Sequence, residues 1–173
     1  GLAGQVDRSG ASRIGVVFPY TPQIQVTHAA NYSAQKLTHN NYTQYYYDNS
    51  EVQAISITGE FTVQNINEGQ YLLAAIYFFR SCTKMFFGQS ALAGTPPPVV
   101  YLDGYGKAYL PRVPCVIQSF SHTMPADVDY IEIAYSAGNG SAASPANSTQ
   151  QRARLPTSSQ INITLQPIYS RNN

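Results

Sequence analysis

The sequence predicts a mainly β fold, an antiparallel β-sandwich or barrel with one flanking α-helix over residues 67–87. Short runs rich in Val, Ile, Tyr and Phe recur along the chain, and Gly and Pro turn signals separate them. Only one segment places apolar residues at helical spacing. The 173 residues suffice for one sizeable domain. Together these observations indicate about seven or eight strands and one helix packed in layers.

The first 50 residues divide into a lead, a strand and a long connection. Residues 1–13 are small and polar, so we expect a flexible lead or linker there and the main domain over 14–173. A proline-marked turn then leads to a strand over 23–28. Residues 29–50 show no sustained period and are expected to form a long loop. Because the loop is rich in tyrosine, we expect it to pack against something, such as a neighbouring chain; its tyrosines are Tyr32, Tyr42, Tyr45, Tyr46 and Tyr47.

Residues 51–64 alternate apolar and polar side chains, which predicts one long strand or two collinear strands. Gly59 interrupts the pattern, and a glycine inside a strand indicates a bulge or bend. The helix follows directly. Asn67 with Gln70 three residues later is typical of a capping box, Glu68 lies in the first turn, and Gly88 can end the helix.

The predicted helix is apolar on more than one side. Leu73, Tyr77 and Phe78 lie outside its main apolar stripe. Such a helix is either covered by several elements of its own chain or packs against a second subunit. Tyr77 and Phe78 therefore join the five tyrosines of 29–50 as candidate interface residues.

The pattern of the second half of the chain predicts short strands separated by prolines and glycines. Strands are expected over 99–103, 107–110, 116–120, 129–135 and 158–169, with a turn at Asp103-Gly104. Residues 136–151 are rich in small side chains and are expected to form a mobile loop. Prolines at 96–98, 111 and 114 should mark strand starts and edges. Exposed strand edges must be hidden or paired with identical neighbours, and pairing around a ring would close one large barrel.

Composition bears on the function classes. Charged residues make up 11% of the chain, against about 25% in typical domains, and the net charge is +1. Without clustered Lys and Arg, an electrostatic nucleic-acid binder is not expected. The low charge and abundant Tyr fit permanent association, and they equally fit a β-rich domain that simply uses Tyr. No apolar run approaches the ~20 residues of a membrane-spanning helix.

The sequence offers no compelling catalytic or metal-binding pattern, so we expect neither an enzyme nor a cofactor. Cys82 and Cys115 lack metal-ligand spacing and are expected to be two free thiols. His122 lies near Ser119 and Ser121, but nothing in the sequence supplies the orienting group and oxyanion hole that a Ser–His pair needs.

Several segments together carry a family resemblance. They are FPYTPQIQV, the two NY pairs at 31–32 and 41–42, ISITGEFTVQNINEGQYLLAAIYFFRSCTKMFFG, AGTPPPVVYLDGYGK, VPCVIQSFSHTMPADVDYI and ARLPTSSQINITLQPIYSR. These segments resemble the baseplate tail-tube proteins, of the tube initiator or cap group, of contractile-tailed bacteriophages of the T-even type. The resemblance covers most of the chain from about Ile14 onward. The helix and the TPPP hairpin are its most specific parts.

The resemblance implies a tail-tube-like fold in which six copies form a ring and each copy gives strands to a continuous inner β-barrel. It implies a structural virion protein of the tail and baseplate, assembled in the bacterial host cytoplasm, that templates the tube. Its partners would be further copies of itself, the baseplate hub protein and the main tail tube protein, with sheath or tape-measure protein as further contacts. Phage DNA would pass through the lumen without specific binding. On this reading strands 23–28 and 51–64 line the channel, and residues 29–50 reach a neighbouring subunit or ring.

Two alternatives remain open at this point. The first is the main tail tube protein, which should polymerise into long tubes of one protein, whereas an initiator makes one ring. The second, from another class, is a secreted β-sandwich that binds glycans or a receptor. It predicts a signal peptide, an exposed aromatic platform and glycans on the Asn-x-Ser/Thr matches at Asn31, Asn41, Asn139, Asn147 and Asn162.

Overall fold

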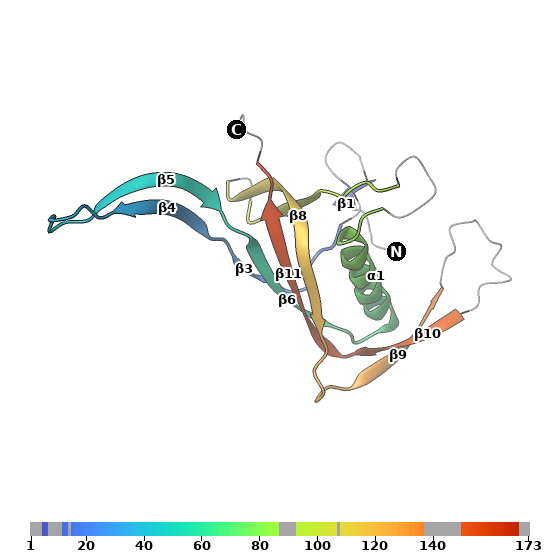
Figure 1. Ribbon diagram of the computed structural model, residues 1–173. Helices are drawn as coiled ribbons and strands as arrows, with labels where there is room; N and C mark the ends of the chain where they lie inside the picture. Colours follow the sequence, from blue (N-terminus) through green and yellow to red (C-terminus); the bar gives the residue numbers. More distant parts are fainter. Residues whose placement is uncertain are drawn as a thin grey trace.

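The computed structural model describes residues 5–6, 12–13, 15–86, 93–106, 108–136 and 150–169, and it confirms a mainly β fold with one helix. Five antiparallel strands form a curled sheet that makes half of a barrel (Figure 1). In spatial order they are β3 (Gln23–Gln25), β6 (Ile55–Thr62), β11 (Ser158–Pro167), β8 (Leu110–Thr123) and β7 (Val100–Gly104). The helix α1 (Ile66–Cys82) lies against this sheet.

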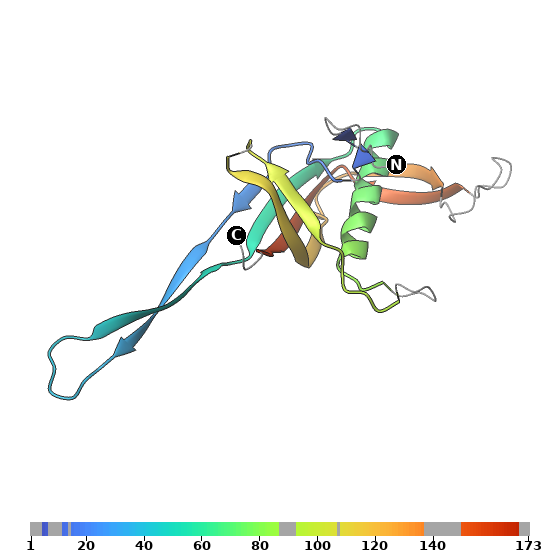
Figure 2. The ribbon, with the colours of Figure 1, turned by 90° about the horizontal axis from the view of Figure 1, so that it is seen from above.

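The remaining strands of the described chain form two-stranded ribbons. β4 (His28–Gln35) and β5 (Gln44–Val52) form a long antiparallel hairpin that projects from the body, here called the arm (residues 28–52). β9 (Tyr130–Ser136) pairs with β10 (Gln150–Pro156) at the opposite end of the molecule (Figures 1 and 2). β1 (Gln5–Val6) pairs with β2 (Ser12–Arg13) near the helix.

The core lies between the sheet and the helix. Alternate residues of β6 and β11 point inward, so Ile57 and Ile163, which are paired across the two strands, are both buried. From the helix, Phe79 stacks on Phe120 of β8 with ring centroids 5.3 Å apart. The buried apolar side chains are Ile55, Ile57, Phe61, Val63, Leu72, Ala75, Phe79, Cys82, Leu110, Val113, Cys115, Ile117, Ile133, Leu155, Ile161, Ile163 and Leu165.

The predicted helix is present, but its start and end differ from the prediction. Asn65, not Asn67, is the N-cap: its side-chain oxygen accepts the backbone N–H of Glu68 at 2.9 Å. Glu68 in turn accepts the backbone N–H of Gln64 at 2.8 Å. Asn65 and Asn67 both fit the capping-box pattern. Asn65 is the cap because the carboxylate that completes the box, that of Glu68, lies three residues after it. The helix ends at Cys82 with Thr83 as C-cap, earlier than predicted, and Gly88 lies outside the described residues.

The prolines of β8 occupy positions different from those predicted. The strand expected over 107–110 is not present, because Ala108 and Tyr109 lie in a turn and residue 107 is not among those described. The strand expected over 116–120 is part of one longer strand that begins at Leu110 and contains Pro111 and Pro114. The carbonyl of Pro114 accepts the N–H of Ile168 at 2.8 Å, beyond the last residue of β11. In an antiparallel ladder the N–H and C=O of one residue point to the same side, so the missing N–H of Pro114 costs no bond to β7.

Pro111 lies in a β-bulge. The register shifts between the pairs Leu102–Val113 and Gly104–Leu110, and Arg112 within the bulge has a φ of 51°. The guanidinium of Arg112 lies 4.7 Å from the ring centroid of Tyr101 on β7, within the range of a cation–π interaction. The prolines at 96–98 come just before β7, which begins at Val100, as predicted for a strand start.

Four further predictions differ from the structure or fall mostly on residues that the structure does not describe. Residues 29–50 are not a loop but most of the arm. The predicted strand over 51–64 is divided: β5 ends at Val52 and β6 begins at Ile55, and the pairing of β6 with β11 runs past Gly59 without a bulge. Most of the predicted lead over 1–13 and of the predicted loop over 136–151 lies outside the described residues. The described parts of the lead are β1 and β2, and the loop lies between β9 and β10.

Candidate functional site

The arm has one aromatic face, which the pairing of its strands creates. Tyr32 lies opposite Tyr47, and Ala34 lies opposite Tyr45. Paired residues of an antiparallel ribbon share a face, so these four side chains lie together. The rings of Tyr32 and Tyr47 meet edge to face with centroids 5.7 Å apart. Tyr42 lies in the turn at the tip of the arm and Tyr46 on the opposite face, so the structure brings together three of the five predicted tyrosines.

The other face of the arm is polar and internally hydrogen-bonded. The side-chain amide of Asn31 donates to that of Asn49 at 2.9 Å, and the hydroxyl of Ser33 donates to the carboxylate of Asp48. The hydroxyl of Tyr46 donates to the side-chain oxygen of Gln44 at 2.7 Å. Glu51 lies on this same face, opposite Ala29. The arm therefore has one aromatic face and one polar face. Such a difference is typical of a strand pair that contacts another molecule on one side.

Neither face of the arm is covered by the part of the chain that the structure describes. Tyr45 is 68% exposed and Tyr42 is 81% exposed. A two-stranded ribbon without a third strand or a packed face is marginally stable in water. Large exposed aromatic surfaces usually mark sites of interaction. The arm is therefore a candidate interface.

Tyr77 and Phe78, the other two predicted interface residues, lie apart from the arm, on the helix. Tyr77 is 52% exposed. Phe78 is partly buried, packs against the core and meets Phe79 edge to face with centroids 5.6 Å apart. Part of the apolar helix surface that predicted an interface is thus buried against the core of the same copy.

The open side of the half-barrel is a second candidate surface. β3 and β7 end the strand order, so each has one edge without a strand partner among the described residues. The hydroxyl of Tyr105 donates to the carbonyl of Pro22 at 3.3 Å and links the two margins. Behind this link lies a cavity of about 1070 Å³, lined by residues 15–22, the end of the helix and β7. The curled sheet is therefore not closed within one copy.

The outward face of the sheet is a third surface, and it is polar with almost no charge. Across β6, β11 and the part of β8 that pairs with β11, its polar residues carry hydroxyl or amide groups, and Glu60 is the one charged side chain among them. Ser158 donates to Glu60 at 3.1 Å. The alternation in ISITGEFT and SSQINITLQ is the sequence signal of this face; it predicted strands but not a polar surface. The face consists of Ser56, Thr58, Glu60, Thr62, Gln118, Ser119, Ser121, Thr123, Gln160, Asn162, Thr164 and Gln166.

The reactive side chains lie apart or buried. Cys82 and Cys115 are buried free thiols, as predicted, and burial raises the pKa of Cys115 to about 11, which makes the nucleophilic thiolate scarce. Within the described residues, no three His, Cys, Asp or Glu side chains gather in a way that could hold a metal ion. In the same part of the chain, no helix is long and apolar enough to cross a membrane.

His122 faces the core and not Ser119 or Ser121. It pairs with the buried Ile161 across β8 and β11, and its Nε2 is buried without a hydrogen-bond partner. Burial lowers the pKa of His122 below its ordinary value. The side chain is thus half-buried, and it is neutral at pH 7.

The buried imidazole predicts that stability falls in mild acid. The unfolded chain binds a proton near pH 6.5, and the folded chain resists binding it until the pH reaches the lowered pKa of His122. Stability is therefore constant above about pH 7 and declines as the pH falls through about 6.5. Urea unfolding between about pH 5.5 and 7.5 should show this slope in the wild type and in His39→Gln, which removes an exposed imidazole of the arm. The slope should be smaller in His122→Leu; an unchanged slope would contradict the prediction.

Comparisons with known proteins add no family to this description. The chain matches no protein-family model and no curated protein sequence. Its function is therefore argued from the three surfaces.

Proposed function

We propose that the protein is a structural virion component whose copies assemble into a hexameric ring of a phage tail tube, at the baseplate of a contractile tail. One observation carries the proposal: the β structure is incomplete within a single copy. The sheet is curled but open, both of its margins lack a strand partner among the described residues, and a tyrosine-bearing ribbon projects from it without cover. Pairing with identical copies around a ring removes such edges and closes a barrel.

The outward face of the sheet supports a channel as the product of assembly. A wall of hydroxyl and amide groups stays wetted and offers few cations to phosphate, so duplex DNA can move along it without being held. Across β6, β11 and the part of β8 that pairs with β11, Glu60 is the one charged side chain of this face, and a carboxylate repels phosphate. In the proposed ring this face lines the lumen, and the aromatic face of the arm is buried against a neighbouring copy.

The proposed place in the virion follows from the family resemblance. As an initiator, the ring lies between the baseplate hub protein and the main tail tube protein and templates the tube, with sheath or tape-measure protein as further contacts. The main tube protein itself is the alternative within this class. The two differ in their product, because a main tube subunit polymerises without limit and an initiator stops at one ring. The exposed tyrosines would also suit a secreted glycan-binding module, which should remain a monomer.

Imaging of a variant with a shortened arm tests the proposal. Replacing residues 30–50 by Asn-Gly keeps the pairs His28–Val52 and Ala29–Glu51 and closes them with a two-residue turn. We expect negative-stain images of the wild type to show rings with a central hole, or stacks of rings, and images of the variant to show neither. Its thermal unfolding midpoint in dilute solution should stay within a few degrees of the wild type, because the core is unchanged.

Tyr109→Ser, which removes a tyrosine that is 64% exposed outside the arm, is the matched control and should assemble normally. Monodisperse monomers of the wild type at all concentrations would refute the ring and favour the glycan-binding alternative. If the variant without the arm forms rings that stack as those of the wild type do, the proposed role of the arm is wrong, but the ring proposal stands.

A further inference from the structure

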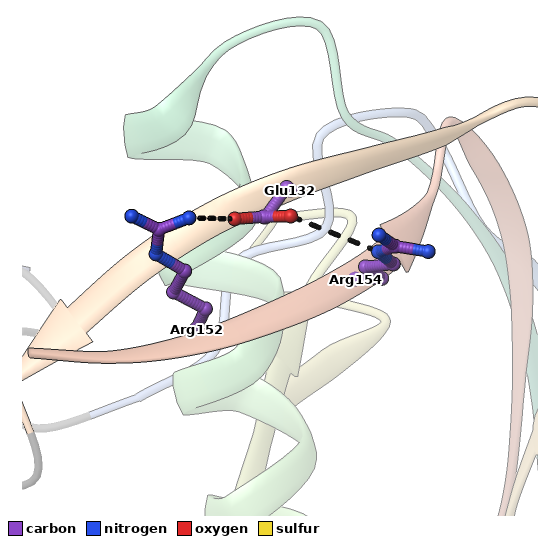
Figure 3. Close-up of polar contacts among 3 residues, drawn as sticks. All are labelled: Glu132, Arg152 and Arg154. Carbon is purple, nitrogen blue, oxygen red and sulfur yellow. Dashed lines mark hydrogen bonds and ion pairs between the residues drawn. The ribbon is translucent and has the colours of Figure 1, made fainter.

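The outer face of the β9–β10 ribbon carries two arginines that share one carboxylate (Figure 3). Arg152 donates to Glu132 Oε1 at 2.8 Å, and Nε of Arg154 lies 3.7 Å from Glu132 Oε2. Arg154 lies directly opposite Glu132 in the ladder, and Arg152 lies opposite Ala134, so all three charged side chains project from the same face. Glu132 thus holds the two guanidinium groups side by side.

This cluster has unused binding capacity for an anion. Two positive charges meet one negative charge, so among the described residues one positive charge stays unbalanced. Each guanidinium has five N–H donors, and Glu132 occupies few of them. The side chains of Arg152 and Arg154 are 77% and 78% exposed. The ribbon itself is fixed, because Ile133 and Leu155 on its other face are buried in the core. A guanidinium group can bind a carboxylate bidentately, through two parallel N–H···O hydrogen bonds, and here two such groups are held in place side by side.

The polar face of the arm offers the complementary charge. Asp48 and Glu51 lie on it, and β4 and β5 contain neither lysine nor arginine. Asp48 receives one hydrogen bond from Ser33, which leaves most of its acceptor sites free. The arm and the β9–β10 ribbon lie at opposite ends of the molecule (Figures 1 and 2). The arm therefore cannot reach its own ribbon, but it can reach the ribbon of another copy.

We propose that the Arg152–Glu132–Arg154 cluster is the docking site for the acidic face of the arm of an adjacent copy, through the carboxylates of Asp48 and Glu51. The contact is heterologous, since different surfaces of the two copies meet, and such contacts generate rings or stacks. One exposed ion pair is worth little. Because the contact recurs in every copy of the assembly, the total stabilisation is much larger than that of one contact, through multivalency. The inference rests on the proposed self-assembly and specifies which surfaces of two copies meet.

A charge exchange between two full-length variants tests this contact. The arm variant carries Asp48→Lys and Glu51→Lys. The ribbon variant carries Arg152→Glu and Arg154→Glu, with Glu132→Gln to avoid three adjacent carboxylates. Alone, each variant places like charges against each other, and we expect its assembly, followed by sedimentation velocity, to need about tenfold higher protein concentration than the wild type. Mixed in equal amounts, the variants present opposite charges again and should co-assemble at concentrations near those of the wild type.

The outcomes separate this inference from the proposed function. Asp127→Arg, at an exposed carboxylate in the turn before β9, is a charge reversal outside the proposed contact and should assemble like the wild type. If the wild type forms rings and both charge variants also form them unaided, the docking inference is wrong and the ring proposal stands. If no form of the chain assembles, both fail. If the ribbon variant assembles normally but loses binding to a labelled DNA duplex that the wild type binds, the cluster serves nucleic acid and the inference is overturned.

Discussion

Replacing Phe61 by alanine should lower the free energy of unfolding by about 3–5 kcal/mol, the largest loss that we expect from a single side chain. Phe61 is 2% exposed and lies on β6, inside the curl of the sheet. Its ring packs against Phe18, with centroids 5.5 Å apart, and it pairs with the buried Ser159 of β11. Truncation removes the transfer free energy of the ring and leaves a cavity, and the pairing of β6 with β11 hinders its collapse.

The loss is large compared with the total stability of a typical domain, about 5–15 kcal/mol. Urea unfolding followed by circular dichroism measures it, and because assembly stabilises the folded state, the experiment should be repeated at several protein concentrations. Phe61→Leu, which keeps most of the volume, should cost less than half as much. Tyr42→Ala, at a ring in the tip of the arm that is 81% exposed, should stay within about 0.5 kcal/mol of the wild type. Equal losses for Phe61→Ala and Tyr42→Ala would contradict the assigned core.

The sequence predicted elements well wherever one face of the element is buried. In β6 and β11 the core imposes strict alternation, and in the helix it imposes spacing of three and four residues, so both patterns appear in the amino-acid order. The prediction of the cap missed by two residues because Asn65 and Asn67 are both good caps. Only the position of Glu68 separates them. Local chemistry therefore determined the type of each element more firmly than its ends.

The arm was missed as a strand pair because nothing in one copy buries either of its faces. Its order comes from cross-strand partners, Tyr32 with Tyr47 and Asn31 with Asn49, and such pairs are visible only once the register is known. β10 was missed for a related reason. Its inward side chains, Ala153 and Leu155, alternate with the exposed Arg152 and Arg154, and this short pattern is too polar to predict a strand. The candidate site was therefore predicted as a group of tyrosines, without the geometry that gives it two faces.

The pairing also explains why Gly59 was misread. A glycine within a strand indicates either a bulge or a close approach by another group, and the sequence alone does not distinguish them. The regular register of β6 against β11 at Gly59 excludes the bulge. A Cβ atom at this position would lie 2.3 Å from Cδ1 of Phe18. Gly59 is therefore required for the aromatic ring that covers it.

Gly59→Ala should accordingly destabilise the protein by about 1–3 kcal/mol, the usual cost of overpacking. The added methyl group must displace the ring of Phe18, and the segment that carries this ring is held in place. The hydroxyl of Tyr71 accepts the N–H of Val17 at 2.7 Å and donates to its carbonyl at 2.9 Å. The methyl group therefore strains residues 15–22, which line the cavity at the open side of the half-barrel. Urea unfolding and limited proteolysis within this segment measure the two effects.

A double mutant shows whether the clash is the cause. In a chain that already carries Phe18→Ala, the ring is absent, so adding Gly59→Ala should cost nothing further and can stabilise the strand by restricting the unfolded chain. Gly15→Ala, where a Cβ atom would meet nothing within 4 Å, is the matched control and should be neutral. Additive losses from Phe18→Ala and Gly59→Ala would show that the two sites do not interact. In that case the packing of residues 15–22 over β6, and with it the assigned shape of the open side of the half-barrel, would be wrong.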